Sequence, residues 1–138
     1  MQLTLERATE ITDRRNQAVV ACDIDAFLAL WADECVVEGP EHRLEGKASL
    51  RAAMEGSWTA MQPIEMVTRS LAVQGNAMFY EFAMLSEVRA TSDRILLSGM
   101  TYHQVDAAGR LKLCREYFDP VGKRRASAAG ESRLAKLL

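Results

Sequence analysis

The amino-acid sequence predicts one α+β domain in which three helices come first and an antiparallel sheet follows. Residues 3–60 show mainly the apolar spacing of amphipathic helices, whereas residues 63–119 show the pattern of strands. Turn-forming residues at 74–76, 91–93 and 106–109 divide the second part into segments joined by connections of hairpin length. Because helices and strands are segregated along the chain, the pattern favours an α+β fold over a doubly wound parallel sheet.

Three helices are expected in the first 60 residues. Asp23 is a suitable N-cap for the second helix, and Gly46 immediately precedes the third. Arg15 lies on the apolar stripe of the first helix, four residues after Ile11 and four before Val19. Its guanidinium either points into a pocket, where it would hold a carboxylate or an enolate, or extends to the helix edge. The expected helices span residues 3–21, 24–33 and 47–60.

The expected strands begin with a short one at 35–38, which Gly39-Pro40 ends before a loop at 41–46. Pro63 then marks the change to strand periodicity. Apolar residues occupy both faces of the longer strands, so one face is expected to pack on the helices and the other on a second chain. A homodimer is therefore predicted. The longer strands are expected at 63–73, 77–90, 94–105 and 110–119.

Length and composition fit an ordinary globular domain. The 138 residues are 49% hydrophobic and 26% charged, which argues against a disordered chain. No apolar run approaches the roughly 20 residues of a membrane span, and the first residues lack the apolar core of a signal peptide. A cytoplasmic protein is therefore expected, with no membrane partner. We assign the domain to residues 1–120 and a basic carboxy-terminal tail to residues 121–138.

The charges and the cysteines narrow the possible partners. Residues 120–138 hold five basic residues and one acidic one, so the preceding part of the chain is acidic although the overall net charge is only −2. An acidic body argues against nucleic acid as the main partner. The three cysteines form no C-x-x-C or Cys/His cluster, and Cys114 would need a nearby base to act as a nucleophile. Because phosphate-binding and metal-ligand motifs are missing from the sequence, no metal and no cofactor are expected.

Two segments carry a family resemblance. Residues 21–40 contain a D-x-D turn between helices, an L-W-A-D-E helix end and a V-E-x-P strand end, and residues 109–120 end in R-E-Y-F-D-P. From about residue 5 to 120 the sequence resembles the nuclear transport factor 2-like (NTF2-like, cystatin-like) superfamily, and most of all its SnoaL-like branch of polyketide cyclases. The resemblance implies a cone-shaped fold, in which three N-terminal helices and a curved antiparallel sheet enclose one apolar pocket, and a dimeric protein.

The resemblance also implies which chemistry the pocket supports. Ketosteroid isomerases, another branch, use a general base just before the proline, a tyrosine in the first helix and a carboxylic acid on a late strand. These positions fall on Gly39, Arg15 and Thr101, so ketosteroid isomerase activity is not expected. SnoaL-type cyclases use a carboxylate on the last strand with a histidine on the strand before it. Those positions fall on Glu116 and His103.

Glu116 also has a place in a third branch, the limonene-epoxide-type hydrolases, which use two aspartates bridged by an arginine. Glu116 falls on one of these acids, whereas the others fall near Leu85 and Glu87, so the bridging arginine is missing unless Arg15 supplies it. Glu116 shares its strand face with Cys114 and Phe118, and it faces the pocket if they do. An epoxide hydrolase therefore stays an alternative, as does a ligand-binding protein without catalysis.

We predict a cofactor-free acid/base enzyme, a cyclase or isomerase, that acts on a small hydrophobic carbonyl compound. Glu116 is the expected acid/base and His103 its partner, and Arg15 or Tyr102 stabilises the enolate. The residues expected to bind the hydrophobic substrate are aromatic residues, methionines and one threonine: Trp31, Met54, Trp58, Tyr80, Phe82, Met84, Thr101 and Phe118.

Glu38 and Glu65 are candidate acids at the mouth of the pocket. Glu65 alternates with apolar neighbours, and Glu38 is out of register with Gly39, so that Glu38 is expected to point away from the pocket. His42 lies in the loop after the Gly-Pro turn and is expected to be solvated.

Overall fold

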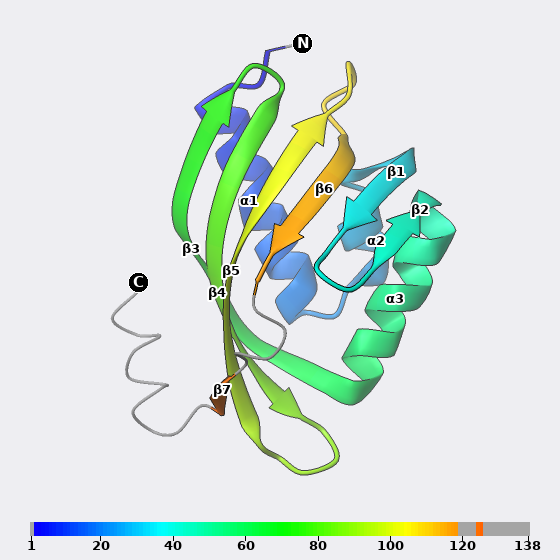
Figure 1. Cartoon of the computed structure of the whole chain (residues 1–138), viewed down its shortest axis with the longest axis vertical. Coiled ribbons are helices and arrows are strands. Elements are labelled where there is room, and N and C mark those ends of the chain that lie inside the picture. The colour runs from blue at the N-terminus through cyan, green and yellow to red at the C-terminus, as the bar shows by residue number, and fades with distance from the viewer. Residues whose placement is uncertain (1, 119–123, 126–138) are drawn as a thin grey trace.

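Figure 1 presents the computed structural model, which describes residues 2–118 and residues 124 and 125. Most of the basic tail expected at 121–138 therefore lies outside the described residues. The elements follow in the order α1 (Leu5–Val20), α2 (Ile24–Leu28), β1 (Trp31–Glu38), β2 (Arg43–Glu45), α3 (Gly46–Ala60), β3 (Met61–Gln74), β4 (Ala77–Val88), β5 (Arg94–Val105), β6 (Leu111–Tyr117) and β7 (Arg124–Arg125).

The sheet has the strand order β2-β1-β6-β5-β4-β3, and β7 pairs with β5 outside this path. The four long strands β3 to β6 form an antiparallel meander, as the hairpin-length turns predict. The sheet is nevertheless mixed, because β1 runs parallel to β6. This parallel pairing joins the first strand of the chain to the last strand of the meander.

The three helices pack on the sheet and bury its inner face. Figure 1 shows α1 lying along the face of the meander, while α3 lies beside β1 and β2. Thr4 and Asp23 cap the first two helices, each accepting a hydrogen bond from a backbone N–H three residues later. The largest side chains that are fully buried are Trp31, Tyr80, Phe27, Ile11, Met78 and Leu111.

The helix expected at 24–33 is shorter than its periodicity predicts. α2 ends at Leu28, and Trp31 already belongs to β1. The cause is a tertiary pairing: Trp31 registers with Leu111, whose N–H donates to the carbonyl of Leu30 at 2.8 Å. Pairing with a distant strand therefore overrides the helical preference of this segment.

Two short strands also lie where none was expected. β2 occupies half of the loop predicted at 41–46 and pairs with β1, placing Arg43 opposite Glu38. β7 lies within the tail, and its backbone pairs with Ile95 and Leu96 of β5. Among the described residues, no helix is both long enough and apolar enough to cross a membrane.

Candidate functional site

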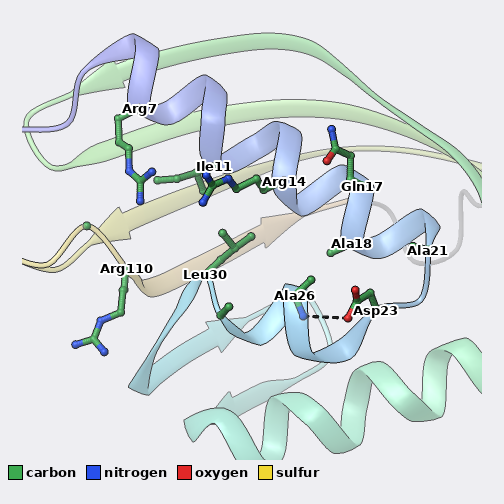
Figure 2. A pocket seen from close by; sticks show the side chains of 12 residues that line it. Arg7, Ile11, Arg14, Gln17, Ala18, Ala21, Asp23, Ala26, Leu30 and Arg110 are labelled. Atoms are coloured by element: carbon green, nitrogen blue, oxygen red, sulfur yellow. Dashed lines mark hydrogen bonds between the residues drawn. The ribbon is translucent and has the colours of Figure 1, made fainter.

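The structure has a broad groove on its outside, between α1, α2 and the turn that joins β5 to β6. Figure 2 shows Arg7 and Arg14 projecting from α1, with Arg110 on the other side of the groove. Its volume is about 460 Å³. Its arginines already have partners, since Arg7 and Arg14 lie 2.5 and 2.6 Å from carboxylate oxygens of Glu10, and Arg110 lies 3.4 Å from Asp106. The groove therefore contains charged groups that are satisfied within the protein.

A second cavity, of about 260 Å³, lies inside the fold between α1, α3 and the inner face of the sheet. Most of its lining is apolar, and methionine is prominent in it. Four polar or charged side chains interrupt this lining, namely Arg15, His42, Ser57 and Glu116. Apolar walls with a few convergent polar groups are typical of a small-molecule site. The apolar lining residues include Met54, Met61, Met66, Met84, Phe82, Leu97 and Phe118.

Glu116 reaches this cavity because of the parallel pairing of β1 with β6. The register places Glu38 opposite Arg115, so the next residue of each strand brings Glu116 beside Gly39. A tight turn follows, in which the N–H of Gly39 donates to the carbonyl of His42 at 2.9 Å. The turn returns His42 to the same place, where its Nε2 lies 3.4 Å from Oε2 of Glu116. Two segments far apart in sequence thus form one His–Glu pair.

Gly39 makes room for the histidine of this pair. A Cβ atom at position 39 would lie 2.4 Å from Cε1 and 2.9 Å from Nδ1 of His42, which is closer than atoms of this kind approach. The imidazole therefore occupies the space that a side chain at position 39 would fill. Both members of the pair remain partly accessible, with 24% of the Glu116 side chain and 38% of the His42 side chain exposed. The pair lies at the mouth of the cavity rather than in its depth.

Arg15 lies deeper, on α1, and only 7% of it is exposed. Its Nε and Nη1 atoms are buried and have no hydrogen-bond partner. The guanidinium carbon lies 5.9 Å from the ring centre of Phe27 and 5.7 Å from that of Tyr80. Of the two orientations that the sequence left open, the structure has the inward one, because Arg15 lines the cavity.

His103, the expected partner of Glu116, is placed elsewhere. It registers with Cys114, whereas Glu116 registers with Thr101, and it does not come within ion-pair distance of Glu116. His103 is fully buried, and its Nε2 lies 4.0 Å from Sγ of Cys114. Burial, together with the positive charge of Arg15, lowers the pKa of His103 to about 3. The imidazole is therefore neutral near pH 7, and the histidine beside Glu116 is His42.

The residues expected to bind the substrate divide into two groups. Four of them line the cavity, namely Met54, Phe82, Met84 and Phe118. The other four, Trp31, Trp58, Tyr80 and Thr101, are buried but do not belong to its lining. Trp31 illustrates the reason, since its ring packs against Phe27 and His103 in the core.

The remaining candidates also lie away from the cavity. Glu38 forms ion pairs with Arg43 and Arg115, in keeping with the expectation that it points outward. Tyr102 packs against Phe79, and its hydroxyl accepts a hydrogen bond from Gln104. Glu65 pairs with β4 at Leu85 and does not line the cavity.

Cys114 on β6 lacks the reactive thiolate that a nucleophilic cysteine needs. Burial raises the pKa of the Cys114 thiol, and the charge of Glu116 raises it further. The thiol thus stays protonated. In the described part of the chain, no three His, Cys, Asp or Glu side chains are grouped so that they could hold a metal ion.

Sequence reasoning missed His42 as a site residue. The available signal was its distance from Gly39: a Gly-Pro turn followed closely by histidine returns the imidazole to a strand end that lacks a side chain. Nothing in the sequence indicated the parallel register between β1 and β6, which brings Glu116 to the same strand end.

Solved structures with the same fold come from several kinds of protein. An LEH-like epoxide hydrolase of Mycobacterium tuberculosis is 20% identical with a TM-score of 0.73, over 95% of this chain and 93% of that chain. A Δ5-3-ketosteroid isomerase of Mycobacterium sp. is 18% identical with a TM-score of 0.74, over 87% of this chain and 98% of that one. A candidate polyketide cyclase of Pseudomonas putida is 21% identical with a TM-score of 0.72, over 83% and 92%. Identities this low establish the fold alone.

The family itself is established by sequence. No curated protein sequence matches this chain. The family model of the SnoaL-like domain matches residues 13–113, which include α1 from its middle turns, both His103 and His42, and most of the sheet. Because this segment covers most of the chain, the protein belongs to the SnoaL-like domain family.

Proposed function

We propose that this protein is a cofactor-free acid/base enzyme that acts on a small hydrophobic carbonyl compound, by isomerisation or aldol-type cyclisation. The observation that carries the proposal is the pair of Glu116 and His42, whose Oε2 and Nε2 atoms lie 3.4 Å apart at the mouth of an apolar cavity. Structural neighbours described as an isomerase and a candidate cyclase are consistent with it. A closed, cone-like arrangement of helices and sheet around the cavity is part of the same proposal.

In this mechanism Glu116 removes a proton from the carbon next to the substrate carbonyl. The electron pair of the broken C–H bond moves into the new C=C bond, and the carbonyl oxygen takes up the negative charge. His42 positions the Glu116 carboxylate through the contact at the cavity mouth. Arg15, in the same cavity, stabilises the negative charge electrostatically, because a buried guanidinium acts in a medium of low dielectric constant. In isomerisation, Glu116 then returns the proton to a different carbon. In aldol-type cyclisation, the enolate carbon attacks a second carbonyl, whose oxygen takes up the electron pair of the broken C=O π bond and receives the proton from Glu116.

The proposal assigns the partner role to His42 rather than to His103. A proton-transfer group acts best when its pKa lies near the working pH, and the pKa of His103 lies at about 3. His103 is also enclosed by Trp31, Tyr80 and Cys114, away from the cavity lining.

Deuterium uptake from D₂O into the methyl group of 2-acetonaphthone, followed by proton NMR, tests the proposal. The wild-type protein is expected to accelerate this exchange, and Glu116→Gln to slow it by about 10²–10⁴-fold, the usual contribution of a general base. The matched control is Glu81→Gln, because Glu81 is a similarly exposed carboxylate on β4 that pairs with Arg69 outside the cavity. Exchange by Glu116→Gln at an accelerated wild-type rate would contradict Glu116 as the base. A wild-type protein that does not accelerate the exchange would contradict the proposal and favour a ligand-binding protein without catalysis.

Epoxide hydrolysis of the limonene-epoxide type has less support. That chemistry uses two acids bridged by an arginine, whereas Glu116 is the one carboxylate among the described residues that line the cavity. Glu87, near the position of the other acid, instead lies 3.7 Å from Arg94.

We also propose that the protein is a cytoplasmic homodimer without a nucleic-acid partner, joined through the outer face of its sheet. Phe79, Met100 and Tyr117 are large hydrophobic residues exposed there, and Met100 registers with Tyr117 on the neighbouring strand. Light scattering is expected to give twice the chain mass of 15.4 kDa. A mass equal to that of one chain would contradict the dimer.

A further inference from the structure

We propose that Arg15 binds a carboxylate of the substrate, so that the cavity takes a small apolar organic acid that also carries the reacting carbonyl. This inference rests on the proposed function, since it names the substrate class for the same cavity. It follows from the state of Arg15, which is a buried cation without a counter-ion in the described part of the chain.

An arginine side chain keeps its proton at any pH at which the protein is folded, so burial cannot neutralise it. Arg15 is nine-tenths buried, and no carboxylate of the described residues lies within ion-pair distance of it. Two of its three nitrogens, Nε and Nη1, are buried without a hydrogen-bond partner. A buried charged group normally has a counter-ion and hydrogen-bond partners. Arg15 lacks a counter-ion, and two of its nitrogens lack hydrogen-bond partners, so an anion is the missing component.

Two aromatic rings lie against the guanidinium of Arg15. The faces of Phe27 and Tyr80 lie 5.9 and 5.7 Å from its central carbon, and such contacts attract a cation without neutralising it. The hydroxyl of Tyr80 already donates to the amide oxygen of Asn16. These aromatic rings hold the guanidinium in place and leave Nε and Nη1, its two buried donor atoms without a partner, for a ligand.

The geometry of the Arg15 guanidinium indicates which kind of anion it binds. A guanidinium presents a planar fork of donors that matches the two oxygens of a carboxylate. An enolate oxygen acquires its charge only during the reaction, so it cannot be the counter-ion of Arg15 when the substrate first binds. With a carboxylate bound to it, the guanidinium still lies in the cavity where the enolate charge develops. A phosphate would bring nearly two negative charges into a cavity that already contains Glu116. A carboxylate satisfies the donors and adds one charge only.

The walls and the volume of the cavity indicate what the rest of the ligand is. The walls include Met54, Met66 and Met84 with Phe82, and flexible thioether side chains adapt to flat or branched apolar groups. The volume of about 260 Å³ is below the range of drug-sized pockets, which begins at about 300 Å³. The ligand is therefore a small aromatic or branched acid, with its carboxylate at Arg15 and its reacting carbon towards Glu116.

The experiment compares two probes of nearly equal shape, 2-naphthoate and 2-acetonaphthone, which differ in carrying a carboxylate or a neutral methyl ketone. Calorimetric titration of the wild-type protein is expected to give binding of 2-naphthoate about 10- to 100-fold tighter than that of 2-acetonaphthone, the range of a charged hydrogen-bonded pair. Arg15→Met should remove this preference, because methionine keeps the apolar stem and loses the charge. Arg14→Met is the matched control, since Arg14 is the adjacent residue, exposed and paired with Glu10.

The outcomes separate this inference from the proposed function. Equal affinity of the wild-type protein for the two probes, or a preference that survives in Arg15→Met, overturns the carboxylate site, whatever the exchange assay gives. Should Arg15→Met fail to fold, the ¹⁵Nε signal of Arg15 in the wild-type protein provides the readout. A shift on titration with 2-naphthoate and none with 2-acetonaphthone supports the site, and the reverse overturns it. Glu116→Gln is expected to keep the preference for 2-naphthoate, so a failed exchange assay with an intact preference counts against catalysis alone.

Discussion

Arg14 and Arg15 are neighbours in sequence, yet they lie in two regions that differ in whether the arginine has a counter-ion. Arg14 faces the outer groove, where its side chain is 60% exposed and lies 2.6 Å from Glu10 (Figure 2). Arg15 faces the interior cavity, where it is 7% exposed and two of its nitrogens have no partner. One step along the helix thus separates a satisfied cation from an unsatisfied one.

This difference teaches that volume is a poor guide to the site. The outer groove is larger, but the arginines on its rim are paired with Glu10 and Asp106, so a ligand would have to compete with those carboxylates. The interior cavity is smaller and contains a cation that lacks a counter-ion. A buried cation without a counter-ion indicates a site for an anionic ligand. Exposed ion pairs contribute little to stability and do not indicate a ligand site.

The largest expected effect of the interior environment is on the pH dependence of stability, through His103. Its pKa is about 3 in the folded protein and about 6.5 in the unfolded chain. Between these values the unfolded chain binds the extra proton, so stability is full above about pH 6.5 and is lost as the pH falls towards 3. The loss is expected to approach about 1.4 kcal/mol per pH unit. Urea unfolding at several pH values measures it.

His103→Leu is the matched variant for this prediction, because the imidazole makes no ordinary hydrogen bond that leucine would remove. The variant should lose less stability on acidification than the wild-type protein. Arg15→Met sharpens the comparison: without the neighbouring charge, the pKa of His103 should rise but remain below 6.5, since burial is the larger cause. Parallel pH profiles for the wild-type protein and His103→Leu would contradict a buried neutral imidazole.

A smaller effect is expected from the two arginines themselves. Arg15→Met should raise the free energy of unfolding by about 1–3 kcal/mol, because it removes a buried cation with unsatisfied donors and keeps most of the packing. Arg14→Met should change it by less than about 0.5 kcal/mol, as is usual for an exposed ion pair. Urea unfolding without ligand measures both. A loss of stability in Arg15→Met would mean that the contacts with Phe27 and Tyr80 make the guanidinium a structural element, and the two regions would then differ less than we infer.

The part of the fold that the sequence predicted depends on local signals. The turn between β3 and β4 is an example: Gly75 adopts a φ of +60°, which glycine tolerates, and the strands end at Gln74 and begin again at Ala77. Asp23 caps α2 as its side chain predicts. Strand alternation likewise places Glu116 and Phe118 on one face, and both line the cavity.

The missed features all depend on contacts between distant segments. Trp31 leaves the expected helix because it pairs with Leu111, and His42 meets Glu116 because β1 runs parallel to β6. Neither pairing has a local signature in the sequence, because the two residues of each pair are separated by more than half of the chain. His103 was expected beside Glu116 from a family position, and its register with Cys114 places it in the core instead.

A small effect on stability is also expected from exchanging glycine for alanine at the mouth of the cavity and, as a control, on α3. Gly56 has open space around it on the exposed side of α3, so Gly56→Ala should stabilise the protein by about 0.5–1 kcal/mol through helix propensity alone, with unchanged exchange activity. Gly39→Ala introduces a Cβ into the space of the His42 imidazole, and the ring at the end of a partly exposed side chain can move aside. Its stability should therefore change by less than about 1 kcal/mol, whereas deuterium exchange should slow by up to about a hundredfold, because His42 would no longer hold the Glu116 carboxylate. Thermal unfolding and the exchange assay with 2-acetonaphthone measure the two quantities. If Gly39→Ala exchanged as fast as Gly56→Ala, the pairing of His42 with Glu116 would have no part in proton transfer, and Glu116 would have to act without it.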